Sequence, residues 1–237
     1  MGFHTMRFFR SVAALAAACM VVPAAHAADH ADAAPRWLSA ITFAPDHAFA
    51  PPPAPGSLEE KLDLDRLRAL IAASSPERIA QADWDGEHKE PAIFDKALGK
   101  DIATLPHTLA LANLVQDEVE RVVAVAKHHF RRARPFMVDP ALPHCGKGEQ
   151  ALKAYPSGHS AFAWSVAWTL AQLAPDRAAA LMAKAQDYTL SREICGVHFA
   201  TDVEAAHGMA TAAAQALLSD PRLAPMVAAA RAEWPAH

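Results

Sequence analysis

The chain has 237 residues, of which 52% are hydrophobic and 20% are charged. This composition excludes a disordered chain, and the length suits one globular domain with a proper core. The formal net charge of −4 excludes a global basic field, so neither nucleic acid nor an anionic membrane surface is an expected partner. Specificity for an anion must come from a local cluster of cations.

The first 27 residues have the pattern of a cleaved export signal. Arg7 and Arg10 give it a positive start, an apolar stretch covers residues 12–22, and Ala25 and Ala27 are the small residues that a signal peptidase reads. The stretch is shorter than the roughly 20 residues that span a bilayer. We therefore expect cleavage after residue 27 and a periplasmic or secreted protein. Charges interrupt every later apolar segment, so we expect no membrane span.

Cysteine usage agrees with an exported protein. Cys19 lies inside the signal, where a lipoprotein anchored through it is an alternative to simple cleavage. Removal of the signal leaves Cys145 and Cys195, and two cysteines in an oxidising compartment favour one disulfide. Two buried free thiols are the alternative.

An extended N-terminal segment over residues 28–56 is predicted to precede the folded domain at residues 57–237. Within it, residues 45–56 end in Pro-Pro-Pro-Ala-Pro-Gly, which cannot hold a regular ladder of hydrogen bonds and predicts a linker.

Helical patterns then follow one another to the C-terminus. Ser57 and Glu60 are predicted to form a capping box at the start of one helix, and Ser75 followed by a proline is predicted to open a second, short helix. An amphipathic stripe predicts a long helix over residues 104–131. Further helices are expected over residues 157–173, 175–191, 200–218 and 221–233. No alternating pattern is long enough for a strand, so we predict an all-α, single-domain helical bundle.

The first candidate motif is Lys127 followed seven positions later by Arg134 and a proline. It falls where the long helix is expected to end. Cations at a helix C-terminus often only complement the helix dipole, and we interpret His128, Arg131 and Arg132 in that way. Alone, this motif is weak.

The second motif is Pro156-Ser157-Gly158-His159. Serine is a good N-cap, and a glycine leaves the backbone N–H groups of a helix N-terminus open to an anion. His159 follows at the mouth of that helix, where an imidazole could donate a proton. A capped helix with a surface histidine is the simpler interpretation.

The third motif is Ser191-Arg192, then His198, then Asp202. Residues four apart on a helix share a face, so Asp202 is expected to accept a hydrogen bond from His198. That bond would fix the tautomer and leave a lone pair on the other ring nitrogen. A structural His–Asp pair is the simpler interpretation.

Together, the three motifs fill each role that phosphoryl transfer requires. The cations are Lys127, Arg134 and Arg192, the neutral donors are Ser157 and the Gly158 amide, the nucleophile is His198 oriented by Asp202, and the acid is His159.

The same residues resemble the signature of the type 2 phosphatidic acid phosphatase (PAP2) superfamily, which includes bacterial class A acid phosphatases, membrane lipid phosphatases and vanadium haloperoxidases. The stretch from Ser191 to Asp202 is similar to the class A enzymes in particular. The resemblance implies a PAP2-type helical bundle, a disulfide between Cys145 and Cys195, broad hydrolysis of phosphate monoesters without a metal, and self-association in some relatives. Vanadate is expected to bind as a phosphate analogue.

The resemblance also implies a two-step mechanism. His198 attacks phosphorus while His159 protonates the leaving alcohol, and water activated by His159 then hydrolyses the phosphohistidine. An acidic to mildly acidic optimum is expected, because His198 must be neutral while His159 is protonated.

Other functions remain alternatives. A haloperoxidase would hold vanadate in the same cradle, a lipid phosphatase would normally bring membrane helices, and a non-catalytic phosphate-binding module would need the cations but not the oriented His198. No compact zinc motif occurs among the 13 histidines, so no metal is expected. The physiological ester, transfer to alcohols and the oligomeric state stay open.

Overall fold

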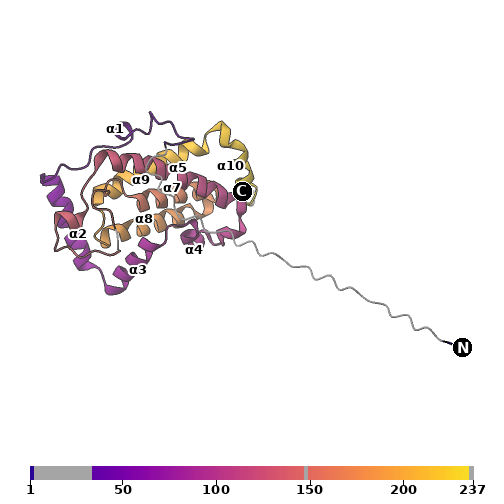
Figure 1. Ribbon diagram of the computed structural model, residues 1–237, viewed down its shortest axis with the longest axis horizontal. Coiled ribbons are helices and arrows are strands. Elements are labelled where there is room, and N and C mark those ends of the chain that lie inside the picture. Colours follow the sequence, from indigo (N-terminus) through magenta and orange to yellow (C-terminus); the bar gives the residue numbers. More distant parts are fainter. Residues whose placement is uncertain (3–33, 147–148, 235–237) are drawn as a thin grey trace.

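The computed structural model describes residues 1–2, 34–146 and 149–234. The predicted export signal lies outside the described residues except for its first two. Every regular element in the described part of the chain is a helix (Figure 1), which confirms the all-α prediction. None of these helices has the length and apolarity that a bilayer span requires. The longer helices are α2 (Leu58–Ala73), α3 (Pro76–Glu87), α5 (Pro106–Phe130), α7 (Gly158–Leu173), α8 (Ala178–Ile194), α9 (Ala200–Leu218) and α10 (Ala224–Arg231).

Helix α7 forms the centre of the bundle. It packs against α5, α8 and α9, and nearly all of its side chains are buried. Many of them are alanine or serine, which lets the neighbouring helices approach closely. Trp164 is buried and stacks on His207 at 3.6 Å between ring centroids, as expected of a core residue. This arrangement fixes the N-terminus of α7, which carries the second motif, between the ends of α5 and α8.

The N-terminal segment differs from the predicted linker. Residues 45–48 form a short helix, α1 (Pro45–Ala48), because proline suits the first helical position and Asp46 favours the first turn. The flanking Phe43 and Phe49 are buried in the main core, and α1 packs on α5. The segment is therefore part of the domain, and the extended assignment of residues 45–48 was wrong.

Helix starts were predicted well where a serine caps them. The hydroxyl of Ser57 accepts the N–H of Glu60 at 3.2 Å, and that of Ser75 accepts the N–H of Arg78 at 3.2 Å. Glu60 does not close a full capping box, because its carboxylate accepts the N–H of Gly56 at 2.7 Å. Short elements connect the long helices. No pattern predicted η2 (Pro91–Phe94), α4 (Asp95–Leu98), η3 (Ile102–Thr104) and α6 (Pro135–Val138), whereas η4 (Pro175–Arg177) and η5 (Pro221–Leu223) lie at the predicted starts of the helices from residues 175 and 221.

Candidate active site

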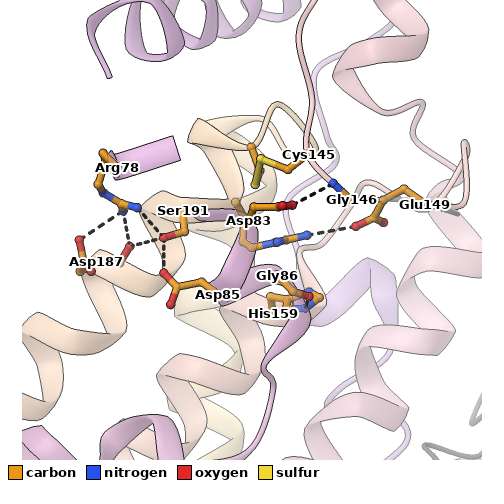
Figure 2. Close-up of a disulfide and its surroundings, with 12 residues drawn as sticks. Arg78, Asp83, Asp85, Gly86, Cys145, Gly146, Glu149, His159, Asp187 and Ser191 are labelled. Carbon is orange, nitrogen blue, oxygen red and sulfur yellow. Dashed lines mark hydrogen bonds and ion pairs between the residues drawn. A yellow bond between two sulfur atoms is a disulfide. The ribbon is translucent and has the colours of Figure 1, made fainter. Parts of the chain in front are cut away.

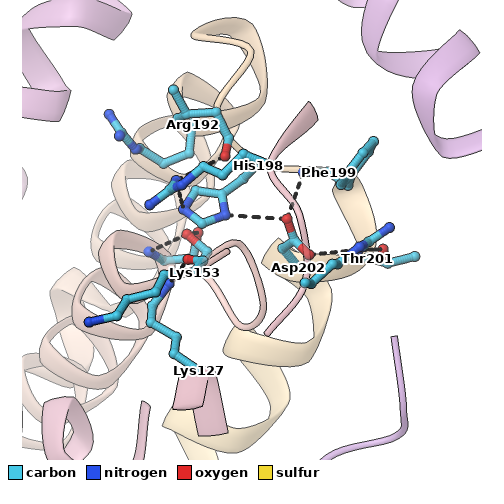
Figure 3. A network of polar contacts seen from close by, with 12 residues as sticks. Lys127, Lys153, Arg192, His198, Phe199, Thr201 and Asp202 are labelled. Carbon is cyan, nitrogen blue, oxygen red and sulfur yellow. Dashed lines mark hydrogen bonds and ion pairs between the residues drawn. The ribbon is translucent and has the colours of Figure 1, made fainter. Parts of the chain in front are cut away.

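A histidine–aspartate pair lies at the junction of α8 and α9. His198 is 1% exposed. Its Nδ1 lies 3.3 Å from Oδ2 of Asp202 (Figure 3), and its Nε2 lies 3.0 Å from Nη1 of Arg134. A carboxylate only accepts and a guanidinium only donates, so the ring carries its proton on Nδ1 and a lone pair on Nε2. The unprotonated nitrogen therefore faces a cation, in the orientation that a nucleophile for an anionic substrate needs.

The backbone around this pair corrects one expectation. His198 precedes α9 and does not share a helical face with Asp202. Asp202 is instead the third residue of α9, and its Oδ2 also accepts the N–H of Phe199 at 2.9 Å. The carboxylate thus caps the start of its own helix while it orients the imidazole, which fixes its position from two directions.

Arg132 has a different role from the one interpreted from the sequence. It lies after α5, is buried, and donates from Nη1 to Oδ1 of Asp202 at 2.6 Å. Its Nη2 reaches Oδ2 of Asp63 on α2 at 3.2 Å, and Thr201 donates to the same Asp63 carboxylate. Arg132 is therefore a buried ion-pair partner that holds Asp202. The interpretation of Arg132 as a cation that only complements the helix dipole was wrong, because sequence spacing could not show Asp63 or Asp202 nearby.

The three predicted cations come from different elements. Lys127 lies in the last turn of α5 and donates to the carbonyl of Lys153 (Figure 3). Arg134 follows α5 and also donates to the carbonyl of Val197 at 2.9 Å. Arg192 lies in the last turn of α8 and is 3% exposed. Arg134 and Arg192 share one carboxylate, that of Glu149, at 2.5 and 3.0 Å.

The N-terminus of α7 lies beside these cations. Ser157 is fully buried and caps the helix, accepting from the N–H of Ser160 at 3.4 Å and from its hydroxyl at 3.0 Å. Its own hydroxyl proton remains available to an anion. A Cβ built on Gly158 would lie 3.8 Å from Cε of Lys127 and 4.0 Å from Nζ of Lys89. Lys89 is a further cation of the site that no motif indicated.

His159 is oriented by α3, a helix with no predicted part in the site. Its Nε2 lies 3.1 Å from the carbonyl oxygen of Gly86 (Figure 2). A carbonyl only accepts, so Nε2 of the neutral ring carries the proton. The buried Asp85 anchors α3 by accepting from Ser191 of α8 at 2.5 Å, and Arg78 donates to the same hydroxyl at 3.0 Å. The serine of the third motif is thus a structural link between α3 and α8.

Gly86 also leaves space for the side chain of Arg192. A Cβ at this position would overlap Nη1 of Arg192. Gly86→Ala is therefore expected to displace that guanidinium and to weaken inhibition by phosphate about tenfold, a loss of about 1.4 kcal/mol of binding free energy. Alanine is the better helix former, so the substitution should not destabilise α3 through helix propensity. The measurement is the inhibition constant of inorganic phosphate. Gly208→Ala on α9, where a Cβ meets nothing within 4 Å, is the matched control. Equal constants for the two variants would contradict the steric argument.

Burial and the neighbouring cations lower the pKa of both histidines. Burial lowers the pKa of His198 well below its ordinary value, and Arg134 and Lys127 lower it further. Burial, Arg192 and Lys89 likewise lower the pKa of His159. Both rings are therefore neutral in the empty site at mildly acidic pH. Burial and Arg134 also lower the pKa of Lys127, and a bound anion would oppose all three shifts.

A cavity of about 950 Å³ opens next to Arg192 and Glu149. Its walls come from α3, the end of α2, the end of α8 and the segment after α6. They are largely apolar, with Ile71, Ile79, Ala80 and Ile194 among them. The cavity is large enough for the leaving group of a small ester. Among its described lining residues, Arg192 is the one arginine or lysine, and the carboxylates are those of Asp83, Glu87 and Glu149.

The segment after α6 is joined to the end of α8 by a disulfide between Cys145 and Cys195 (Figure 2). Asp83 lies close to both sulfurs, and this is the one group of potential metal ligands among the described residues. Sulfurs bonded to each other are not thiolates, so this group does not fit a metal ion.

Comparisons with known proteins show the family of this chain. The sequence profile of the PAP2 superfamily matches residues 102–223. An acid phosphatase from Zymomonas mobilis is 36% identical over 190 residues, which cover 73% of this chain and 68% of the relative. A non-specific acid phosphatase from Providencia stuartii is 29% identical, over 78% of each chain, and one from Salmonella typhi is 30% identical, over 72% of this chain and 76% of the relative. A solved transmembrane PAP2-type phosphatidylglycerolphosphate phosphatase from Bacillus subtilis has a TM-score of 0.49 and 18% identity, covering 67% of this chain and 84% of that structure.

Proposed function

This chain belongs to the PAP2 superfamily and is an acid phosphatase, and from that premise we propose that it is exported and hydrolyses a range of phosphate monoesters through a phosphohistidine at His198. The observation that carries the proposal is the orientation of this ring. Its Nδ1 is engaged by Asp202, and the lone pair on its Nε2 faces the guanidinium of Arg134. A non-catalytic anion binder needs the cations but has no use for a buried, oriented nucleophile.

In the first step, Nε2 of His198 attacks phosphorus, and the bond from phosphorus to the ester oxygen breaks. The proton for the departing oxygen comes from His159, and Nη1 of Arg134 turns from Nε2 to a nonbridging oxygen. In the second step, His159 takes a proton from water, the water oxygen attacks phosphorus, and the nitrogen–phosphorus bond breaks. Inorganic phosphate leaves, and both histidines return to their starting states.

The cations act mainly on the transition state. Lys127, Arg134 and Arg192 face charge that spreads over the nonbridging oxygens, and the N–H groups at the start of α7 add fixed dipoles. General acid–base help contributes about 10²–10⁴-fold. The preorganised cradle must supply much of the remaining rate enhancement.

Proton transfer explains why acidic conditions suit this enzyme. His198 has a depressed pKa and is neutral, as a nucleophile must be, even at mildly acidic pH. His159 also has a depressed pKa in the empty site, but a bound phosphate dianion raises it toward its ordinary value. The acid form therefore exists in the substrate complex below that raised pKa and is lost as pH increases through it.

A panel of phosphate esters tests the function. We expect enzyme recovered from the periplasm, with Ala28 as its first residue, to release phosphate from several monoesters and to lose kcat as pH rises above neutrality. Chelator should leave the rate unchanged, because the proposed steps use no metal. Vanadate should inhibit in competition with the ester, because it resembles the phosphoryl group in transition.

Three results would count against the proposal. Strong inhibition by chelator would require a metal mechanism, and a rate that climbs steadily above pH 9 would contradict His159 as the acid. Halide oxidation with vanadate and peroxide, without ester hydrolysis, would assign the cradle to a haloperoxidase.

A further inference from the structure

The carboxylate of Glu149 bridges the two arginines of the phosphate cradle. Its Oε2 lies 2.5 Å from Nη2 of Arg134, and its Oε1 lies 3.0 Å from Nη2 of Arg192. Figure 2 shows Glu149 close to Gly146 and to the disulfide at Cys145. No motif drew attention to this residue.

A carboxylate in this position resembles part of a phosphoryl group. Both present two oxygens on one central atom, and guanidinium groups bind both through paired N–H donors. The two arginines donate to Glu149 through the atoms that a phosphate between them would use. Substrate and Glu149 therefore compete for the same donors.

The empty site gives a physical reason for such an anion. Arg134 is 6% exposed and Arg192 is 3% exposed, and burial lowers the pKa of both while Glu149 raises it again. Buried like charges without a partner destabilise a fold. The single negative charge of Glu149 offsets part of this charge.

The side chain also has room to leave. Glu149 is 21% exposed and borders the cavity of about 950 Å³ beside Arg192. The backbone next to it is held separately, because the carbonyl of Gln150 accepts from Nε of Arg134 at 3.2 Å and the N–H of Arg134 donates to Ala151 at 2.9 Å. Rotation of the side chain alone would clear the arginines.

We propose that Glu149 is a resident competitor that occupies the phosphate site of the free enzyme and swings into the cavity when substrate binds. The proposal rests on the proposed function for the identity of the site. It assigns Glu149 a role in setting affinity: every substrate must displace the same carboxylate, so KM is raised for all esters alike. Because Glu149 has left the arginines when substrate is bound, it should not affect kcat.

Glu149→Gln tests this role. We expect inorganic phosphate to bind the variant about 10- to 100-fold more tightly in calorimetry, with KM lowered in proportion and kcat within about threefold of the parent enzyme. Phosphate should also raise the melting temperature of the variant more than that of the parent. Glu87→Gln removes a carboxylate from the same cavity wall and should change phosphate affinity much less. If Glu149→Gln does not fold, Glu149→Asp, too short to bridge both arginines, should show the same trend.

The opposite result would assign a different role. Weaker phosphate binding by Glu149→Gln would mean that the carboxylate positions the arginines, and unchanged binding would mean that it does not compete; either overturns the proposal. Calorimetry with phosphate needs no turnover. Tighter binding by an enzyme that hydrolyses no ester would therefore refute the proposed function alone, and unchanged binding by an active phosphatase would refute this inference alone.

Discussion

Replacement of His198 by alanine is expected to lower kcat by at least about 10⁴-fold, because removal of a nucleophile leaves only the binding energy and electrostatics of the site. The measurement pairs steady-state hydrolysis with acid-quenched reactions on a phosphate-labelled ester. The parent enzyme should retain label on the protein as a phosphohistidine, and the variant should retain none. Vanadate should still bind the variant, because Lys127, Arg134 and Arg192 are unchanged.

A matched histidine controls for general effects of the substitution. His207 lies on α9, stacked on Trp164, and His207→Ala should keep both the rate and the labelled intermediate. Two results would contradict the assignment of His198. One is a variant that hydrolyses esters at a rate close to the parent, and the other is label that persists on the variant. A parent protein that binds phosphate without any turnover would instead be the binding module.

Sequence patterns were sufficient for the fold wherever a local signal existed. Serine residues predicted where α2 and α3 begin, and the patterns over residues 104–131 and 157–173 predicted α5 and α7 to within a few residues, because such signals act within one helical turn. The prediction for residues 45–48 was wrong because the prolines near them suggested a linker, whereas burial of Phe43 and Phe49 holds this segment on the core. Local propensity cannot show that kind of long-range packing.

The site divides in the same way. The motifs predicted the candidate cations and histidines that lie around the site, because residue type and spacing alone indicate that chemistry. The partners that orient those groups come from distant segments: Arg132 pairs with Asp202 across 70 positions, and Gly86 accepts from His159 across 73. Glu149 lies near the second motif, but an acidic residue between cationic motifs has no pattern that distinguishes it. Only the geometry shows that its two oxygens are divided between two arginines.

The disulfide is expected to make the largest contribution to stability of any single bond in the fold. It joins residues 50 positions apart, and closure of a loop of that length stabilises the folded state by about 4 kcal/mol in the chain-entropy model. The double variant Cys145→Ala/Cys195→Ala should lose about that free energy of unfolding. For a domain of this size, the melting temperature should fall by about 8–16 °C.

The disulfide also bears on the active site, because it ties the segment that carries Glu149 to the end of α8, where Arg192 lies. The N–H of Cys145 donates to the carbonyl of Cys195 at 2.9 Å, and a Cβ on Gly196, at φ 65°, would overlap the carbonyl of Pro143. Both contacts also keep the two segments close. Loss of the disulfide should still loosen the segment that carries Glu149 and, because that carboxylate competes with substrate in our proposal, should lower KM as well as stability. The measurement is denaturant unfolding with and without dithiothreitol. The reductant should lower the free energy of unfolding of the parent enzyme as much as the double substitution does, and it should not change that of the double variant. A loss below about 1 kcal/mol in both would show that packing around Gly196, and not the covalent bond, holds the segments together.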